Sequence, residues 1–107
     1  MASASSSPFR YEVEMSGDTT TIKCHGRIVA ENAQELKQLV KPMIPKCRRI
    51  VLDFSDLHYL DSSGLGMLVG LKISSASAAY CAMELVNLSP HVKELFGLTK
   101  LNHLFGT

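Results

Sequence analysis

The sequence contains no tryptophan and only three cysteines in 107 residues. The cysteines are odd in number and stand at long, irregular spacings (Cys24, Cys47 and Cys81), so they do not outline a disulfide framework. Cys24 and Cys81 lie in apolar stretches, which predicts small buried side chains, and Cys47 is expected to be an inert loop thiol. This usage excludes a disulfide-stabilised secreted scaffold and is typical of the reducing cytoplasm.

Long apolar runs are absent as well. No window approaches the roughly 18–20 apolar residues of a membrane-spanning helix. Residues 1–8 lack the basic region and following apolar run of a signal peptide. We therefore expect a soluble, cytoplasmic protein without a membrane segment.

An excess of either charge is also missing, because eleven basic and ten acidic residues give a net charge of +1. A dedicated nucleic-acid-binding protein would usually show a clustered basic surface, whereas the only basic cluster here is at residues 46–49. We predict no direct nucleic-acid partner. The four histidines have no spacing suited to a shared metal ion, so neither a metal nor another cofactor is expected: His25, His58, His91 and His103.

The length and a hydrophobic fraction of 46% suit a single domain with its own packed core. Residues 1–8 are rich in serine and alanine without periodicity, which predicts a flexible N-terminal tail. Residues 9–107 contain no further linker or repeat and are predicted to form the one domain.

Alternation of polar and apolar residues at the start of the domain predicts a hairpin. Tyr11, Val13 and Met15 alternate with polar neighbours, a Gly17-Asp18 turn follows, and residues 19–28 are rich in β-branched side chains. A glycine near the end of the second strand, Gly26, predicts a bulge or a close approach of another backbone segment there.

The remaining pattern alternates between helix and strand. An amphipathic helix is expected from Ala30, ended by Pro42 and Pro45. The apolar run at 49–54 predicts a central strand covered on both faces, followed by a loop over 55–61. A second helix is expected over 62–79, a strand over 83–86, and a third helix over 90–96 ended by a glycine, before a last apolar segment at 101–105. The second helix should bury one apolar stripe, with Lys72 reaching outward to water: Leu65, Leu68, Val69, Ile73 and Ala76. This order predicts an α/β sandwich with a mixed sheet.

The segment Asp61-Ser62-Ser63-Gly64-Leu65-Gly66 carries the most chemical information. It opens the second helix, and Asp or Ser there accepts hydrogen bonds from the amides of the first turn. The glycines are expected to relieve crowding around those amides, and Leu65 to hold the turn on the core. A phosphate on such a serine would add about −1.5 to −2 charges and meet amides that already point toward it.

On these residues alone, a plain capped helix and a phosphorylation site both remain open. A phosphate-binding loop of the nucleotide type would carry lysine where Met67 stands. A catalytic nucleophile elbow would carry glycine two residues before the serine, where Leu60 and Asp61 precede the two serines. We therefore predict no catalytic residue and no enzymatic activity.

Four segments of the chain match a known family: Ile50-Val51-Leu52-Asp53-Phe54, the stretch from Tyr59 to Leu68, Leu85-Val86-Asn87 with Ser89-Pro90, and the stretch from Leu95 to Leu101. With them, the chain from about Tyr11 to Leu104 resembles a STAS domain of the anti-sigma-factor antagonist family. The resemblance implies a STAS-like α/β sandwich with a mixed sheet of four to five strands and three to four helices. It also implies a bacterial, cytoplasmic regulator.

The resemblance implies a mechanism. Such proteins bind a serine kinase of the histidine-kinase-like ATPase fold that doubles as an anti-sigma factor, and the unphosphorylated form frees a sigma factor. A metal-dependent serine phosphatase reverses the modification. Carried onto this chain, the phosphoacceptor is Ser62, Asp61 positions it and contacts the partner, and Ser63 supports the turn together with Gly64, Leu65 and Gly66. A monomer or weak dimer is implied.

The chain departs from the family pattern beside this turn, because Val29 and Arg27 stand where acidic residues are frequent. Two further functions therefore stay open. One is a STAS subunit that serves as a scaffold in a larger signalling assembly. The other is a module that senses a nucleotide or another ligand at the start of the second helix.

Overall fold

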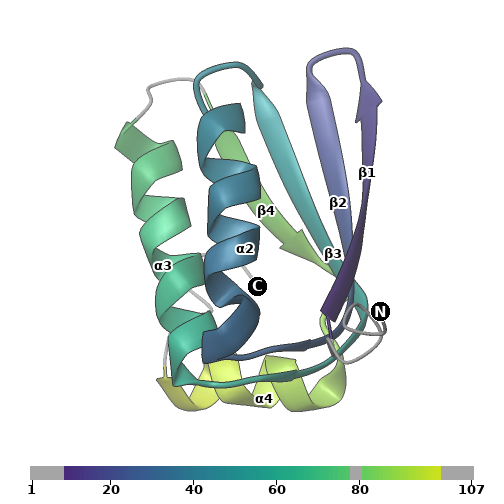
Figure 1. Ribbon diagram of the computed structural model, residues 1–107, viewed down its shortest axis with the longest axis vertical. Helices are drawn as coiled ribbons and strands as arrows, with labels where there is room; N and C mark the ends of the chain where they lie inside the picture. Colours follow the sequence, from purple (N-terminus) through teal and green to yellow (C-terminus); the bar gives the residue numbers. More distant parts are fainter. Residues whose placement is uncertain (1–8, 78–80, 100–107) are drawn as a thin grey trace.

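In the computed structural model, which describes residues 9–77 and 81–99, two helices lie along one face of a four-stranded sheet (Figure 1). The elements follow in the order β1 (Phe9–Ser16), β2 (Thr19–Ile28), α2 (Ala30–Val40), the 3-10 turn η1 (Lys41–Met43), β3 (Arg49–Leu60), α3 (Ser62–Ser77), β4 (Ala82–Val86) and α4 (Pro90–Thr99). This order confirms the predicted α/β fold class. The predicted tail at 1–8, the end of the second helix at 78–79 and the apolar segment at 101–105 lie outside the described residues.

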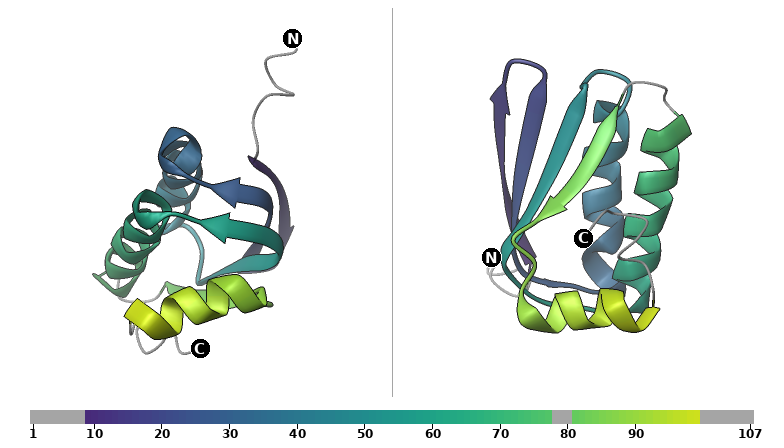
Figure 2. Two further views of the ribbon diagram at one scale, coloured as in Figure 1. Left: turned by 90° about the horizontal axis from the view of Figure 1, so that it is seen from below. Right: turned by 180° about the vertical axis from the view of Figure 1, so that it is seen from behind.

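The sheet has the order β1-β2-β3-β4 and is mixed, as predicted. β1 and β2 form the expected antiparallel hairpin around Gly17, which has a φ of 60°. β2, β3 and β4 are mutually parallel. Figures 1 and 2 show α2 and α3 side by side on one face, and α4 across the end at which β2 and β3 finish. Nothing in the described part of the chain is a helix long and apolar enough to cross a bilayer.

β3 is longer than the sequence pattern predicts, and the loop expected over 55–61 is wrong. The strand continues to Leu60 because its pairing with β2 resumes after two register shifts, with His25 opposite Asp56 and Ile28 opposite Leu60. Each shift leaves one extra residue in β3, which interrupts the alternation that marks a strand. Gly26, with a φ of 94°, lies between the shifts and confirms the predicted bulge.

The middle of β3 is covered on one face only, as far as residues 9–77 and 81–99 show. Ile50, Leu52 and Phe54 are fully buried toward α2 and α3, whereas Val51 and Asp53 between them are partly exposed. The expectation of cover on both faces is therefore wrong. The open face carries charged side chains from all four strands, including the Arg49–Glu84 ion pair between β3 and β4.

The buried face of α3 also differs from the predicted stripe. The buried residues are Gly64, Met67, Leu68, Leu71 and Ser75, so only one predicted position is fully buried, and Ile73 is 56% exposed. The apolar residues of α3 occur on most sides of the helix, so their spacing in the sequence does not identify which face is buried. The ammonium of Lys72 does not reach outward, because its Nζ donates a hydrogen bond to the Met83 carbonyl at 2.8 Å.

Candidate functional site

The predicted site residues lie together where β3 ends and α3 begins, at the carboxyl end of the parallel strands (Figure 1). Ser62 is the first residue of α3 and its side chain is exposed, as is that of Ser63. Asp61 and Leu65 are half-buried. Ligands of open α/β sheets commonly bind outside this end of the strands. The turn therefore displays both serine hydroxyls on a surface that another molecule can reach.

Asp61 is the residue that fixes the turn. Its Oδ1 accepts a hydrogen bond from the Gly64 amide at 2.9 Å, which confirms the predicted cap of the second helix. Its Oδ2 accepts a second hydrogen bond, from the Ala30 amide at 3.2 Å. Its own amide donates to the Ile28 carbonyl at 3.2 Å. The carboxylate of Asp61 therefore joins the first turns of α2 and α3, and its backbone amide ties the turn to the end of β2.

The start of α2 depends on this distant carboxylate. Val29 stands at its N-cap position and has no side-chain acceptor for the free amides of the first turn. The buried Asn32 satisfies the Val29 amide through Oδ1 at 2.9 Å and donates to the Arg27 carbonyl. The bond from Ala30 to Asp61 spans 31 positions, so no local sequence signal predicts it.

The two glycines of the turn have different roles. A Cβ atom on Gly64 would lie 2.7 Å from Leu60 Cδ1 and 2.8 Å from the Ile28 carbonyl oxygen, so only glycine lets α3 begin this close to β2 and β3. A Cβ atom on Gly66 would have no neighbour within 4 Å beyond its own stretch of helix. The close approach at Gly64 is to Leu60 and Ile28, and the expectation that both glycines relieve crowding around the amides of the first turn stays a prediction.

Two grooves flank the turn. The first, the α2/α3 groove, has a volume of about 360 Å³ and is lined by Ala30, Ala33, Gln34, Lys37, Ser63, Gly66 and Met67. The second, the α3/α4 groove, has a volume of about 480 Å³ and is lined by Tyr59, Leu60, Asp61, Ser62, Leu65, His91, Leu95 and Thr99. The two serines therefore border different grooves.

An aromatic pair borders the α3/α4 groove beside Ser62. The rings of Tyr59 and His91 stack with centroids 5.8 Å apart and an interplanar angle of 15°. Both side chains are exposed. No local sequence signal connects them, because Tyr59 lies near the end of β3 and His91 lies in the first turn of α4. Together they offer a flat aromatic surface to a molecule that approaches Ser62.

The other residues considered from the sequence take no part in this turn. Cys24 and Cys81 are buried, as predicted, and burial, with a contribution from Asp53, raises the pKa of the Cys24 thiol to about 12. Cys47 is also buried, with its Sγ 3.1 Å from Thr20 Oγ1. Within residues 9–77 and 81–99, no group of three or more potential ligands is arranged for a metal ion, and His103 lies outside the described residues.

Comparison with known proteins identifies the family. The STAS domain model matches residues 10–107. A STAS-domain containing protein of Pseudomonas aeruginosa (strain UCBPP-PA14) is 32% identical over 89 residues, which cover 83% of this chain and 87% of that protein.

Solved structures share the fold. The anti-sigma factor antagonist SpoIIAA in its unphosphorylated form matches with a TM-score of 0.76 and 23% identity over 89% of this chain and 84% of that chain. The phosphorylated form of SpoIIAA, a Bacillus cell fate determinant, matches with a TM-score of 0.72 and 22% identity over 89% and 87%. The likeness confirms the predicted STAS-like sandwich, and with the match of the family model the chain belongs to the STAS domain family.

Proposed function

We propose that this protein is an anti-sigma-factor antagonist whose binding to a partner protein is switched off by phosphorylation of Ser62. The observation that carries the proposal is the exposed position of Ser62 at the first residue of α3, on the border of the α3/α4 groove. SpoIIAA, which shares the fold, is an anti-sigma factor antagonist with solved unphosphorylated and phosphorylated forms.

The turn suits a phosphate because its scaffold is already fixed. The start of a helix stabilises a nearby anion by roughly 0.3–1 kcal/mol at an exposed position. The bonds of Asp61 to Gly64 and Ala30 hold the backbone on either side of Ser62 without using the Ser62 hydroxyl. Phosphorylation therefore adds charge and bulk to the surface while the fold stays in place. A partner seated over the α3/α4 groove would meet both.

The partner chemistry follows from the family resemblance. The partner is a serine kinase of the histidine-kinase-like ATPase fold that also serves as an anti-sigma factor, and a serine phosphatase restores the active form. The protein itself acts by binding, in the bacterial cytoplasm, without catalysis. Asp61 already uses both carboxylate oxygens on backbone amides, so its main part is to position the turn.

Intact-mass measurement tests the site of modification. The wild type, Ser62→Ala and Ser63→Ala proteins are each incubated with the kinase encoded nearby in the genome and ATP. We expect the wild type and Ser63→Ala to gain one phosphate and Ser62→Ala to gain none. Loss of the modification in Ser63→Ala alone, or no modification of the wild type, would contradict the proposal. Calorimetric titration with nucleotides tests the alternative that the protein is a ligand sensor. Sizing of the purified protein tests the alternative that it is a subunit of a larger assembly.

A further inference from the structure

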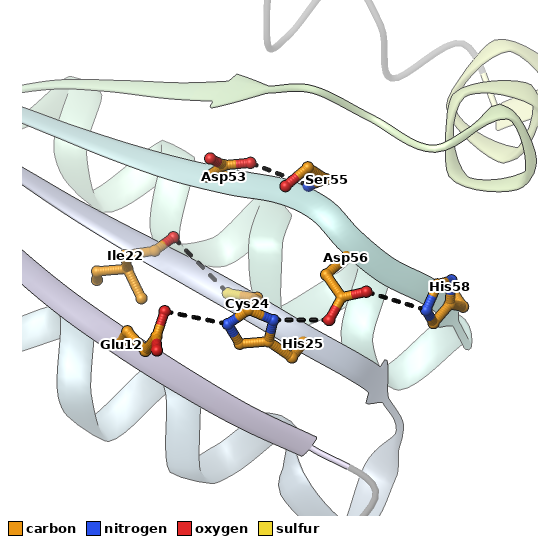
Figure 3. Close-up of polar contacts among 8 residues, drawn as sticks. All are labelled: Glu12, Ile22, Cys24, His25, Asp53, Ser55, Asp56 and His58. Atoms are coloured by element: carbon orange, nitrogen blue, oxygen red, sulfur yellow. Dashed lines mark hydrogen bonds and ion pairs between the residues drawn. The ribbon is translucent and has the colours of Figure 1, made fainter.

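A polar cluster on the open face of the sheet joins three strands (Figure 3). The imidazole of His25 on β2 lies between two carboxylates, with Nδ1 2.7 Å from Asp56 Oδ2 on β3 and Nε2 3.3 Å from Glu12 Oε1 on β1. His58 also approaches Asp56, at 3.3 Å from Nε2 to Oδ1. None of these residues belongs to the turn that carries Ser62.

The geometry is best satisfied by the charged form of His25. A neutral imidazole has one N–H and can donate to only one of the two carboxylates, whereas an imidazolium donates to both. The hydrogen bond to Asp56 is the main cause that raises the pKa of His25 above its ordinary value of 6.5. Partial burial of the ring opposes this shift, and the hydrogen bond to Glu12 adds a smaller rise. The hydrogen bond from His25 likewise lowers the pKa of Asp56 below 3.8.

The cluster sits where the sheet is irregular. His25 and Asp56 face each other directly after the first register shift between β2 and β3, and Gly26 follows with its φ of 94°. Three residues beyond His25, the Ile28 carbonyl accepts the hydrogen bond from the Asp61 amide. The end of β2 and the bulged end of β3 therefore lead from the cluster to the turn that carries Ser62.

We propose that protonated His25 is a pH-dependent clamp, which ties β1 to β3 across the bulge and steadies the strand ends that hold the Ser62 turn. The charged groups around the ring are Glu12 and Arg10 on β1, Lys23 on β2, and Asp56 and His58 on β3. The clamp is an addition to the proposed function and does not depend on it.

The pH range of the clamp follows from the directions of the two pKa shifts. A raised pKa of His25 means that its contribution to stability is complete below 6.5 and is lost as the pH rises through the folded-state value. A lowered pKa of Asp56 means that its contribution is present above 3.8 and is lost as the pH falls through its folded-state value. The clamp is strongest in mildly acidic solution.

The test combines titration with thermal unfolding. NMR titration of the wild type should place the pKa of His25 above 6.5, and Glu12→Gln should lower it. His25→Gln should reduce the Tm more at about pH 5.5 than at about pH 8.5. His91→Gln is the matched control for the loss of a histidine, because within the described residues His91 contacts no carboxylate and stacks on Tyr59 instead.

Hydrogen exchange tests the connection to the turn. At about pH 5.5, His25→Gln should speed exchange of the Asp61 and Ala30 amides, and at about pH 8.5 the difference from the wild type should shrink. A His25 pKa at or below 6.5, or a Tm loss that does not depend on pH, would overturn the clamp. Unchanged exchange at Asp61 and Ala30 would overturn its action on the turn.

Discussion

The carboxylate of Asp61 lies 3.2 Å from the amide nitrogen of Ala30, which joins the residue before α3 to the first residue of α2. The same carboxylate caps α3 through Gly64. Helix starts leave amides without partners inside the helix, and here one side chain serves two helices. The position of Ser62 is thus set by neighbours on both sides of it.

Replacing Asp61 tests this double cap. We expect Asp61→Ala to lower the free energy of unfolding by about 2 kcal/mol, because it removes two hydrogen bonds to a charged acceptor. Asp61→Asn should cost less, since its oxygen can still accept one of them. Ser62→Ala is the control and should change stability by less than about 0.5 kcal/mol, as exposed positions usually do. Urea denaturation measures all three, and equal effects of Asp61→Ala and Ser62→Ala would disprove the role of the cap.

The glycine pair supplies a second test with its own control. Gly64→Ala should destabilise the protein by about 1–3 kcal/mol, because the new methyl group would press on Leu60 and Ile28. Gly66→Ala should be neutral or stabilise by up to about 1 kcal/mol, since alanine favours a helix and the space is open. Thermal unfolding compares them. Similar losses in both variants would show that the close approach at Gly64 is not what requires glycine.

Local sequence patterns predicted most of the fold. They also predicted which residues form the candidate site, but not most of the contacts between those residues and distant parts of the chain. Hairpin, helices and the capped turn each follow from short-range spacing or from Asp61 preceding an apolar helix. The extension of β3 to Leu60 did not follow, because bulges break the period of two that identifies a strand. The bond from Ala30 to Asp61 and the stacking of Tyr59 on His91 join residues far apart in the chain, so only the folded arrangement reveals them.

Asn87 allows a prediction about backbone strain. It follows β4 with a φ of 57°, and its Nδ2 donates to Asp53 Oδ1 at 3.2 Å. Asn87→Gly should lose only the hydrogen bond, because glycine adopts a positive φ without strain. Asn87→Ala should lose the hydrogen bond and also strain the backbone, so it should lower the free energy of unfolding by about 1 kcal/mol more than Asn87→Gly. Chemical denaturation of the two variants measures the difference. A glycine variant less stable than the alanine variant would contradict the assignment of strain.

Thiol chemistry tests the packing of the sheet. Cys24 is buried and its pKa is raised to about 12, so almost no thiolate is present near neutral pH. We expect Cys24 to react with a thiol-specific reagent at least about a hundredfold more slowly in the native protein than in urea. Peptide mapping by mass spectrometry follows the site. Rapid native labelling of Cys24 would show that the sheet and α2 do not pack as described.

The affinity of the proposed partner kinase for the protein, with and without phosphate on Ser62, tests the central claim most directly. We predict that the phosphorylated protein binds at least about tenfold more weakly, because new charge at Ser62 opposes a surface that fits the uncharged hydroxyl. Its unfolding temperature should stay close to that of the unmodified protein. Equal affinities of the two forms would contradict the account.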